Sequence, residues 1–98
     1  MKINITARKF KARDTLKEFI KDEVSALERF ADDIIEAEVI LSFQNQKESV
    51  KIAELIIRVP EHTLTATCES EDFEPSVRKC TEKIITQLKK RKTKRIKH

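Results

Sequence analysis

The sequence predicts an α+β domain of order β-α-β-β-β-α, with a four-stranded mixed sheet and two helices packed on one of its faces. Four segments alternate apolar and polar residues, which is the period of a half-buried strand, and two segments repeat apolar residues at three- and four-residue steps, which is the period of an amphipathic helix. At 98 residues the chain has room for one core. Because each amphipathic helix needs an apolar surface to cover, the simplest arrangement places both helices on the same side of the sheet.

The first strand is predicted over residues 2–7, where every second residue is apolar. The first helix is predicted to run from Asp14 or Thr15 to about Ala31, and Thr15 and Glu18 have the spacing of a capping box. The apolar residues that should lie together on one side of this helix are Leu16, Phe19, Ile20, Val24, Leu27 and Phe30.

Three further strands are predicted between the two helices. The second strand covers residues 38–43 and ends in the polar run 44–49, which should form a turn. The third strand covers residues 50–59, and Pro60 with Glu61 separates it from a fourth strand over residues 63–68. A helical crossover makes the first two strands parallel, and the short turns make the later strands antiparallel. The chain has no glycine, which excludes a glycine-rich phosphate loop and argues against nucleotide hydrolysis.

The last helix is predicted to begin near Asp72, to tolerate Pro75 in its first turn and to extend past Leu88. At 100° per residue its apolar stripe consists of Phe73, Val77, Cys80, Ile84 and Leu88. Nearly opposite lie Lys79, Lys83, Lys90 and Lys94. A frayed tail would have no reason to keep its lysines away from a core face, so this spacing favours a surface helix.

Charge is strongly polarised along the chain. Residues 78–98 carry ten Lys or Arg and a single acid, whereas residues 1–77 carry eleven basic and sixteen acidic side chains. A basic end on an acidic body is typical of proteins that bind nucleic acid, because each cation that meets a phosphate releases a condensed counterion. A merely solvated tail is the alternative interpretation of the charge alone.

Catalytic and metal sites are not expected. Cys68 and Cys80 are twelve residues apart, and neither His62 nor His98 completes a ligand set with them. The same residues lack a partner at a useful spacing for nucleophilic catalysis. We expect two small buried side chains, with a disulfide or redox role as the alternative, and no cofactor. The sequence shows no apolar run long enough for a signal peptide or a membrane span, so we expect a cytoplasmic protein.

Four short motifs occur in a familiar order on this pattern of strands and helices: NIT (residues 4–6), LERF (27–30), EDF (71–73) and EKIITQLKKRK (82–92). Together they resemble the ribosome hibernation promoting factor family, which also contains the ribosome-associated inhibitor protein Y and carries an older label as sigma-54 modulation proteins. The resemblance covers essentially the whole chain. It is to the short form, without the C-terminal dimerisation domain of the long form, so residues 1–92 would be one ribosome-binding domain and 93–98 a short basic tail.

The resemblance implies a non-enzymatic factor, monomeric off the ribosome, that binds the small ribosomal subunit in the mRNA and tRNA channel and inhibits translation under stress or in stationary phase. It implies that Lys83 and Lys90 contact rRNA phosphates. The basic side chains that extend the same patch are Lys79, Lys89, Arg91, Lys92 and Lys94. A second basic group between the first strand and the first helix consists of Arg8, Lys9, Lys11 and Arg13. For this group both rRNA contact and a solvated loop remain open.

One departure from the family concerns the first helix, the role of Phe10 has two interpretations, and two other functions stay open. Asp22 and Glu23 stand in the first helix where relatives often have basic residues, which leaves that helix little rRNA contact beyond Lys17 and Lys21. Phe10 could touch RNA or pack over the end of the sheet. The alternative functions are a protein-interaction module that modulates a transcription (sigma) factor and a generic double-stranded RNA-binding domain.

Overall fold

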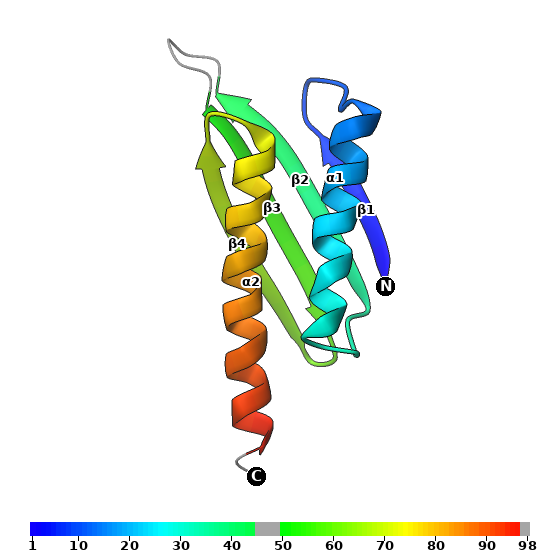
Figure 1. The fold of residues 1–98 in the computed structure, drawn as a ribbon, viewed down its shortest axis with the longest axis vertical. Coiled ribbons are helices and arrows are strands. Elements are labelled where there is room, and N and C mark those ends of the chain that lie inside the picture. The colour runs from blue at the N-terminus through cyan, green and yellow to red at the C-terminus, as the bar shows by residue number, and fades with distance from the viewer. Residues whose placement is uncertain (45–49, 97–98) are drawn as a thin grey trace.

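The computed structural model describes residues 1–44 and 50–96, with side chains described as far as Arg91. Four strands and two α-helices follow the predicted order (Figure 1). The elements are β1 (Lys2–Ala7), α1 (Asp14–Ser25), the 3₁₀ turn η1 (Ala26–Arg29), β2 (Glu36–Gln44), β3 (Val50–Val59), β4 (His62–Ser70) and α2 (Phe73–Ile96). The predicted turn over 44–49 lies almost entirely outside the described residues.

The sheet has the strand order β1-β2-β3-β4. β1 runs parallel to β2, and the two later pairings are antiparallel, so the predicted mixed sheet is confirmed. One row across the sheet joins Ile5 to Val39, Leu55 and Ala66. The last three of these side chains are buried, which identifies the side of the sheet that the helices cover.

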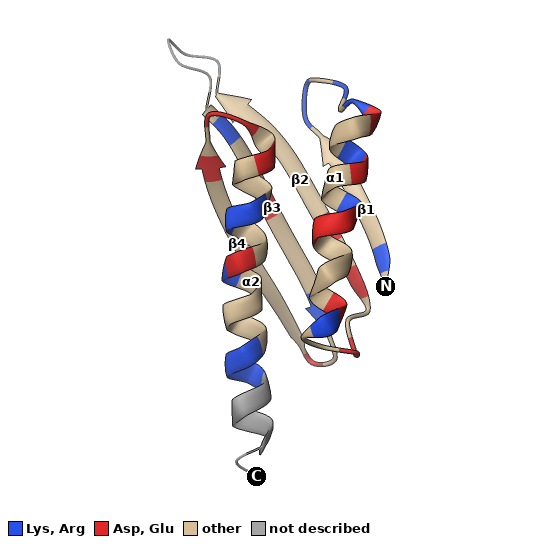
Figure 2. Cartoon of the chain, viewed as in Figure 1, with Lys and Arg blue, Asp and Glu red and all other residues tan. Residues whose placement is uncertain are grey.

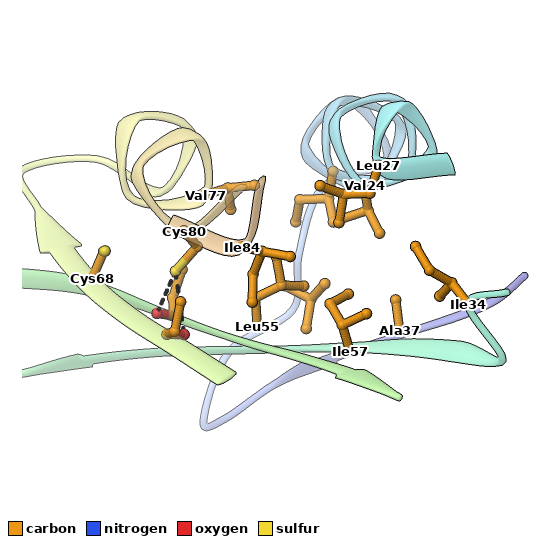
Figure 3. Close-up of a cluster of buried hydrophobic side chains, with 14 of the residues drawn as sticks. Val24, Leu27, Ile34, Ala37, Leu55, Ile57, Cys68, Val77, Cys80 and Ile84 are labelled. Carbon is orange, nitrogen blue, oxygen red and sulfur yellow. Dashed lines mark hydrogen bonds between the residues drawn. The ribbon is translucent and has the colours of Figure 1, made fainter. Parts of the chain in front are cut away.

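Both helices lie on that same side, with the core between them and the strands (Figures 1 and 3). Figure 3 shows Val24 and Leu27 facing the sheet beside Val77 and Ile84 of α2, above Leu55 of β3. All five are at most 1% exposed. Burial of one such side chain contributes about 1.5–3 kcal/mol, so the two apolar stripes account for the placement of both helices.

The first helix begins at Asp14, as predicted, but its N-terminal cap and its C-terminal end differ from the prediction. It starts at Asp14 with Arg13 in the N-cap position and without a side-chain cap, so the predicted capping box of Thr15 and Glu18 is wrong. Thr15 lies inside the first turn, because the amide of Lys17 already donates to the carbonyl of Arg13 at 3.0 Å. The α-helix ends at Ser25 instead of near Ala31, and η1 continues the chain with a tighter winding that keeps Leu27 buried.

Among the residues that the structure describes, two adopt the left-handed backbone conformation that glycine usually provides. Lys9, after β1, has φ 65°, and Glu61, in the turn between β3 and β4, has φ 69°. Each costs about 1–2 kcal/mol relative to the right-handed region. In a chain without glycine, both turns therefore carry a conformational cost that the surrounding strands must offset.

Candidate nucleic-acid interface

Helix α2 separates an apolar side from a cationic side. Val77, Cys80, Ile84 and Leu88 of the predicted stripe are at most 1% exposed. The exposed lysines on the remaining surface are Lys79, Lys83, Lys89 and Lys90. In Figure 2 acidic residues colour the start of α2, and basic residues colour most of the charged positions in the described turns that follow. The periodicity that predicted an exposed lysine row therefore describes the helix correctly.

Polar contacts with the sheet backbone hold α2 in place beneath this row. The hydroxyl of Ser76 donates a hydrogen bond to the backbone carbonyl of Lys51 at 2.7 Å. The side-chain amide of Gln87 donates one to the backbone carbonyl of Thr65 at 2.9 Å. Between them, the Cys80 thiol lies 3.2 Å from the carbonyl of Ala53 (Figure 3). These three contacts, together with the apolar stripe, fix the rotation of the helix about its axis and its position along the sheet.

Lys83 and Lys90 are the most available cations of the row. Within the part of the chain that the structure describes, neither forms an ion pair or a hydrogen bond with a protein group. Lys79 is exposed and its ammonium group lies 3.4 Å from the carbonyl of Glu69. The Lys89 ammonium lies 5.5 Å from the centroid of the Phe30 ring. The ammonium group of Lys79 stays exposed to solvent, and the ring contact helps to orient the Lys89 side chain.

Arg91 differs from the lysines. Its guanidinium forms a two-bond ion pair with the carboxylate of Asp33, with one nitrogen–oxygen distance of 3.2 Å, and its side chain is only 15% exposed. The hydrogen bonds to Asp33 raise the pKa of the Arg91 guanidinium above its ordinary value. Among the predicted contacts whose side chains are described, Arg91 is thus the least available. The side chains of Lys92 and Lys94 lie outside the described residues, although the helical backbone continues to Ile96.

The second basic group lies far from the C-terminal half of α2. Arg8, Lys9, Lys11 and Arg13 are all exposed in the loop between β1 and α1. This loop is at the end of the molecule where α2 begins, whereas the C-terminal turns of α2 extend to the opposite end of a body about 50 Å long (Figures 1 and 2). The fold therefore does not merge the two predicted basic groups into one patch.

Phe10 packs inside this loop. Its ring stacks on that of Phe73 with centroids 5.0 Å apart, and it meets the edge of Phe43 at 5.7 Å. The Lys51 ammonium lies 5.2 Å from the Phe43 centroid and 5.6 Å from that of Phe73. Sequence reasoning did not single out Lys51. Its position at the start of β3, two residues before the buried Ala53, was the available signal that it faces the helices.

The two cysteines provide the remaining candidates for reactive groups. Cys68 and Cys80 are buried free thiols, as expected for small apolar side chains. Burial raises the pKa of the Cys80 thiol to about 12, and the neighbouring Cys68 adds to this rise, so Cys80 is poorly suited to be a nucleophile. Among the described side chains, residues 1–44 and 50–91, no group of three or more His, Cys, Asp or Glu could hold a metal ion. Within the same ranges no helix has the length and apolar character that a bilayer crossing requires.

Known proteins resemble this chain in sequence along nearly its full length. It is 28% identical over 96 residues to the ribosome hibernation promoting factor of Azotobacter vinelandii, covering 98% of this chain and 87% of that protein. It is 30% identical over 96 residues to the ribosome hibernation promotion factor of Bacillus subtilis, covering 96% of this chain and 50% of that protein.

Solved structures give the same result for the fold. A ribosomal subunit interface protein from Coxiella burnetii matches with a TM-score of 0.84 and 26% identity, over 95% of this chain and 99% of that one. The N-terminal domain of Thermus thermophilus Protein Y matches with a TM-score of 0.81 over 92% and 98% of the two chains, and at 21% identity it bears on the fold alone. The family model described as sigma 54 modulation protein / S30EA ribosomal protein matches residues 3–96, and the chain belongs to that family.

Proposed function

We propose that this protein is a non-enzymatic hibernation factor that binds the small ribosomal subunit in the channel used by mRNA and by the anticodon ends of tRNA. By occupying that channel it would block translation under stress or in stationary phase. The observation that carries the proposal is the exposed lysine row of α2, held on a helix whose opposite side is fixed to the core. Family membership and the names of the relatives support a ribosomal partner.

The geometry of the row suits a folded RNA surface. With a rise of about 1.5 Å per residue, Lys79 and Lys83 are spaced by about 6 Å along the helix axis, and Lys83 and Lys90 by about 10 Å. A fixed series of cations recognises the placement of phosphates more than base sequence, as is usual for structured RNA. Because α2 is already held by the sheet, binding would not have to order it.

Sedimentation with purified ribosomal subunits tests the proposal. We expect saturable binding to small subunits that weakens steeply as salt increases and that an excess of generic duplex RNA does not compete away. Lys83→Glu combined with Lys90→Glu should remove the protein from the subunit pellet while leaving the thermal melt nearly unchanged, since both side chains are exposed. An in vitro translation reaction should be inhibited by the unmodified protein and not by the double variant.

Three results would contradict the proposal. Equal affinity for any duplex RNA would indicate a generic RNA-binding domain. Failure to sediment with subunits or to bind RNA would favour a protein partner, such as the transcription factor suggested by the sigma 54 label of the family. A large loss of stability in the double variant would show that the two lysines support the fold.

A further inference from the structure

A cavity of about 750 Å³ lies where the β1–α1 loop meets the start of α2. Its lining includes Phe10, Phe73, Lys11, Arg13, Asp72 and Glu74. The volume falls in the range of about 300–1,000 Å³ that is usual for small-molecule sites. The lysine row of α2 that carries the proposed function contributes none of the lining, so this cavity needs an explanation of its own.

An aromatic wall forms one part of the cavity. The rings of Phe10 and Phe73 are stacked within 10° of parallel, and both border the cavity. Phe43 supports Phe10 from its edge, and Lys51 lies near the rings of Phe43 and Phe73. The two stacked rings come from segments 63 residues apart in sequence, so the wall is a product of the fold. One face of each ring is covered by the other ring, so a planar group can stack only on an outer face of the pair.

The rim of the cavity carries both signs of charge. Lys11 and Arg13 are exposed on the loop side, and Asp72 and Glu74 are exposed at the helix start. The backbone carbonyl of Asp72 accepts hydrogen bonds from Ser76, but within the described residues no group of the protein binds the carboxylate of Asp72 or that of Glu74. The rim therefore presents free cationic donors and free anionic acceptors beside one apolar wall.

This combination of groups limits the ligand. A simple anion would be attracted by Lys11 and Arg13 but repelled by the two carboxylates. A simple cation would be attracted by the carboxylates but repelled by Lys11 and Arg13. A nucleotide satisfies all three features: a flat base stacks on aromatic rings, base amino groups donate to carboxylates, and a phosphate pairs with Lys or Arg.

We propose that this cavity binds a single unpaired nucleotide of RNA. The base lies against the wall of Phe10 and Phe73, and its phosphate faces Lys11 and Arg13. The inference that the nucleotide belongs to RNA rests on the proposed function. It gives the loop basic group a role distinct from that of the lysine row: the row binds phosphates of structured RNA, and the loop captures one base. Because the rim carboxylates accept hydrogen bonds, bases with amino groups, namely adenine, cytosine and guanine, are preferred over uracil.

Titration of the isotope-labelled protein with RNA trinucleotides, followed by amide NMR, tests this inference. A-A-A is compared with a trinucleotide of equal charge whose central residue lacks its base. We expect shifts at Phe10, Leu16 and Phe73, and roughly tenfold weaker binding without the base, as for the loss of one stacked base. Phe10→Leu, which keeps an apolar side chain but removes the ring, should weaken A-A-A by a similar factor and should erase the difference between the two ligands.

Lys11→Ala keeps the test informative should Phe10→Leu fail to fold, because Lys11 is exposed. It should weaken both trinucleotides several-fold, whereas the matched control Lys2→Ala, an exposed lysine on β1 outside the lining, should weaken neither. Equal binding of the two ligands by the unmodified protein, or shifts confined to α2 lysines, would overturn the inference. Base-dependent trinucleotide binding by a protein that does not sediment with small subunits would support the cavity while refuting the proposed function.

Discussion

The two helices share a task in the core and differ on the surface. α1 and α2 lie on the same face of the sheet and bury similar apolar stripes. In sequence, α1 carries two lysines against four acids, whereas α2 carries nine basic residues against two acids. The comparison separates two kinds of information in one amphipathic pattern. The buried positions specify where a helix packs, and the exposed positions specify which partner it can meet.

Matched charge reversals on the two helices should break this comparison most clearly. Lys83→Glu with Lys90→Glu on α2 removes two cations and introduces two anions beside the proposed rRNA phosphates, so we expect small-subunit binding to fall by about a hundredfold or more. Lys17→Glu with Lys21→Glu makes the same formal change on α1 and should cost less than about fivefold. Sedimentation at two salt concentrations, with thermal melts of both variants, provides the measurement.

The salt dependence distinguishes local contact from overall charge. For the α2 pair, the plot of log K against log salt should become shallower by about two units of slope, one for each lost phosphate contact. For the α1 pair the slope should change little. Equal effects of the two pairs on affinity and slope would mean that net charge, and not the position of the lysine row, governs binding.

Sequence reasoning succeeded where a pattern is local and periodic. The alternation of apolar residues was sufficient to predict β1. The spacing from Val77 to Leu88 was sufficient to predict which side of α2 faces the core and that Lys83 and Lys90 are exposed. It failed at features that depend on long-range contacts. Asp33 and Arg91 are 58 residues apart, and no local signal in the sequence pairs them.

The loop features were out of reach for a related reason. The stacking of Phe10 on Phe73 requires the β1–α1 loop and the start of α2 to meet in space, which periodicity cannot show. The positive φ angles of Lys9 and Glu61 occur in residue types with no preference for that conformation. Both residues lie in connections between elements, Lys9 between β1 and α1 and Glu61 between β3 and β4.

Alkaline pH should weaken the attachment of α2 to the sheet. The Cys80 thiol has a pKa of about 12 in the folded protein, against an ordinary value of 9.0, mainly because it is buried. Between these values the folded state holds a proton that the unfolded state has lost, so stability is complete below about pH 9 and decreases as pH rises toward 12. We expect a loss on the order of 1 kcal/mol per pH unit above pH 9.

Urea denaturation between pH 7 and 10.5 measures this effect. Cys80→Ala should be less stable at pH 7, because it loses the contact with the carbonyl of Ala53, but its stability should decrease less steeply above pH 9. Lysine titration contributes to the slope in both proteins and cancels in the difference. If the free energies of unfolding of the two proteins decrease equally above pH 9, the ionisation of Cys80 does not cause the loss of stability.

Release of Arg91 should sharpen the contrast between its ion pair and the exposed lysine row. Asp33→Ala leaves the guanidinium without its carboxylate partner at a site only 15% exposed, so we expect a loss of about 1–2 kcal/mol in the free energy of unfolding. The freed cation should at the same time steepen the salt dependence of small-subunit binding by up to about one unit. Asp32→Ala, a neighbouring exposed acid, serves as the control for loss of one negative charge.

The smallest effect should come from the contact that joins the two helices. Arg78 of α2 lies 3.9 Å from the carboxylate of Glu23 on α1, and its guanidinium is 5.2 Å from the centroid of Phe19. Because the Arg78 side chain is 64% exposed, solvent screens the ion pair, and Arg78→Ala should cost less than about 1 kcal/mol.

A double-mutant cycle with Glu23→Ala separates the ion pair from the ring contact. If the ring contact dominates, Glu23→Ala alone should be nearly neutral, and Arg78→Ala should cost the same in either background. A coupling above about 1 kcal/mol would instead show that charge links the helices, and that the acidic surface of α1 helps to position the cationic one of α2.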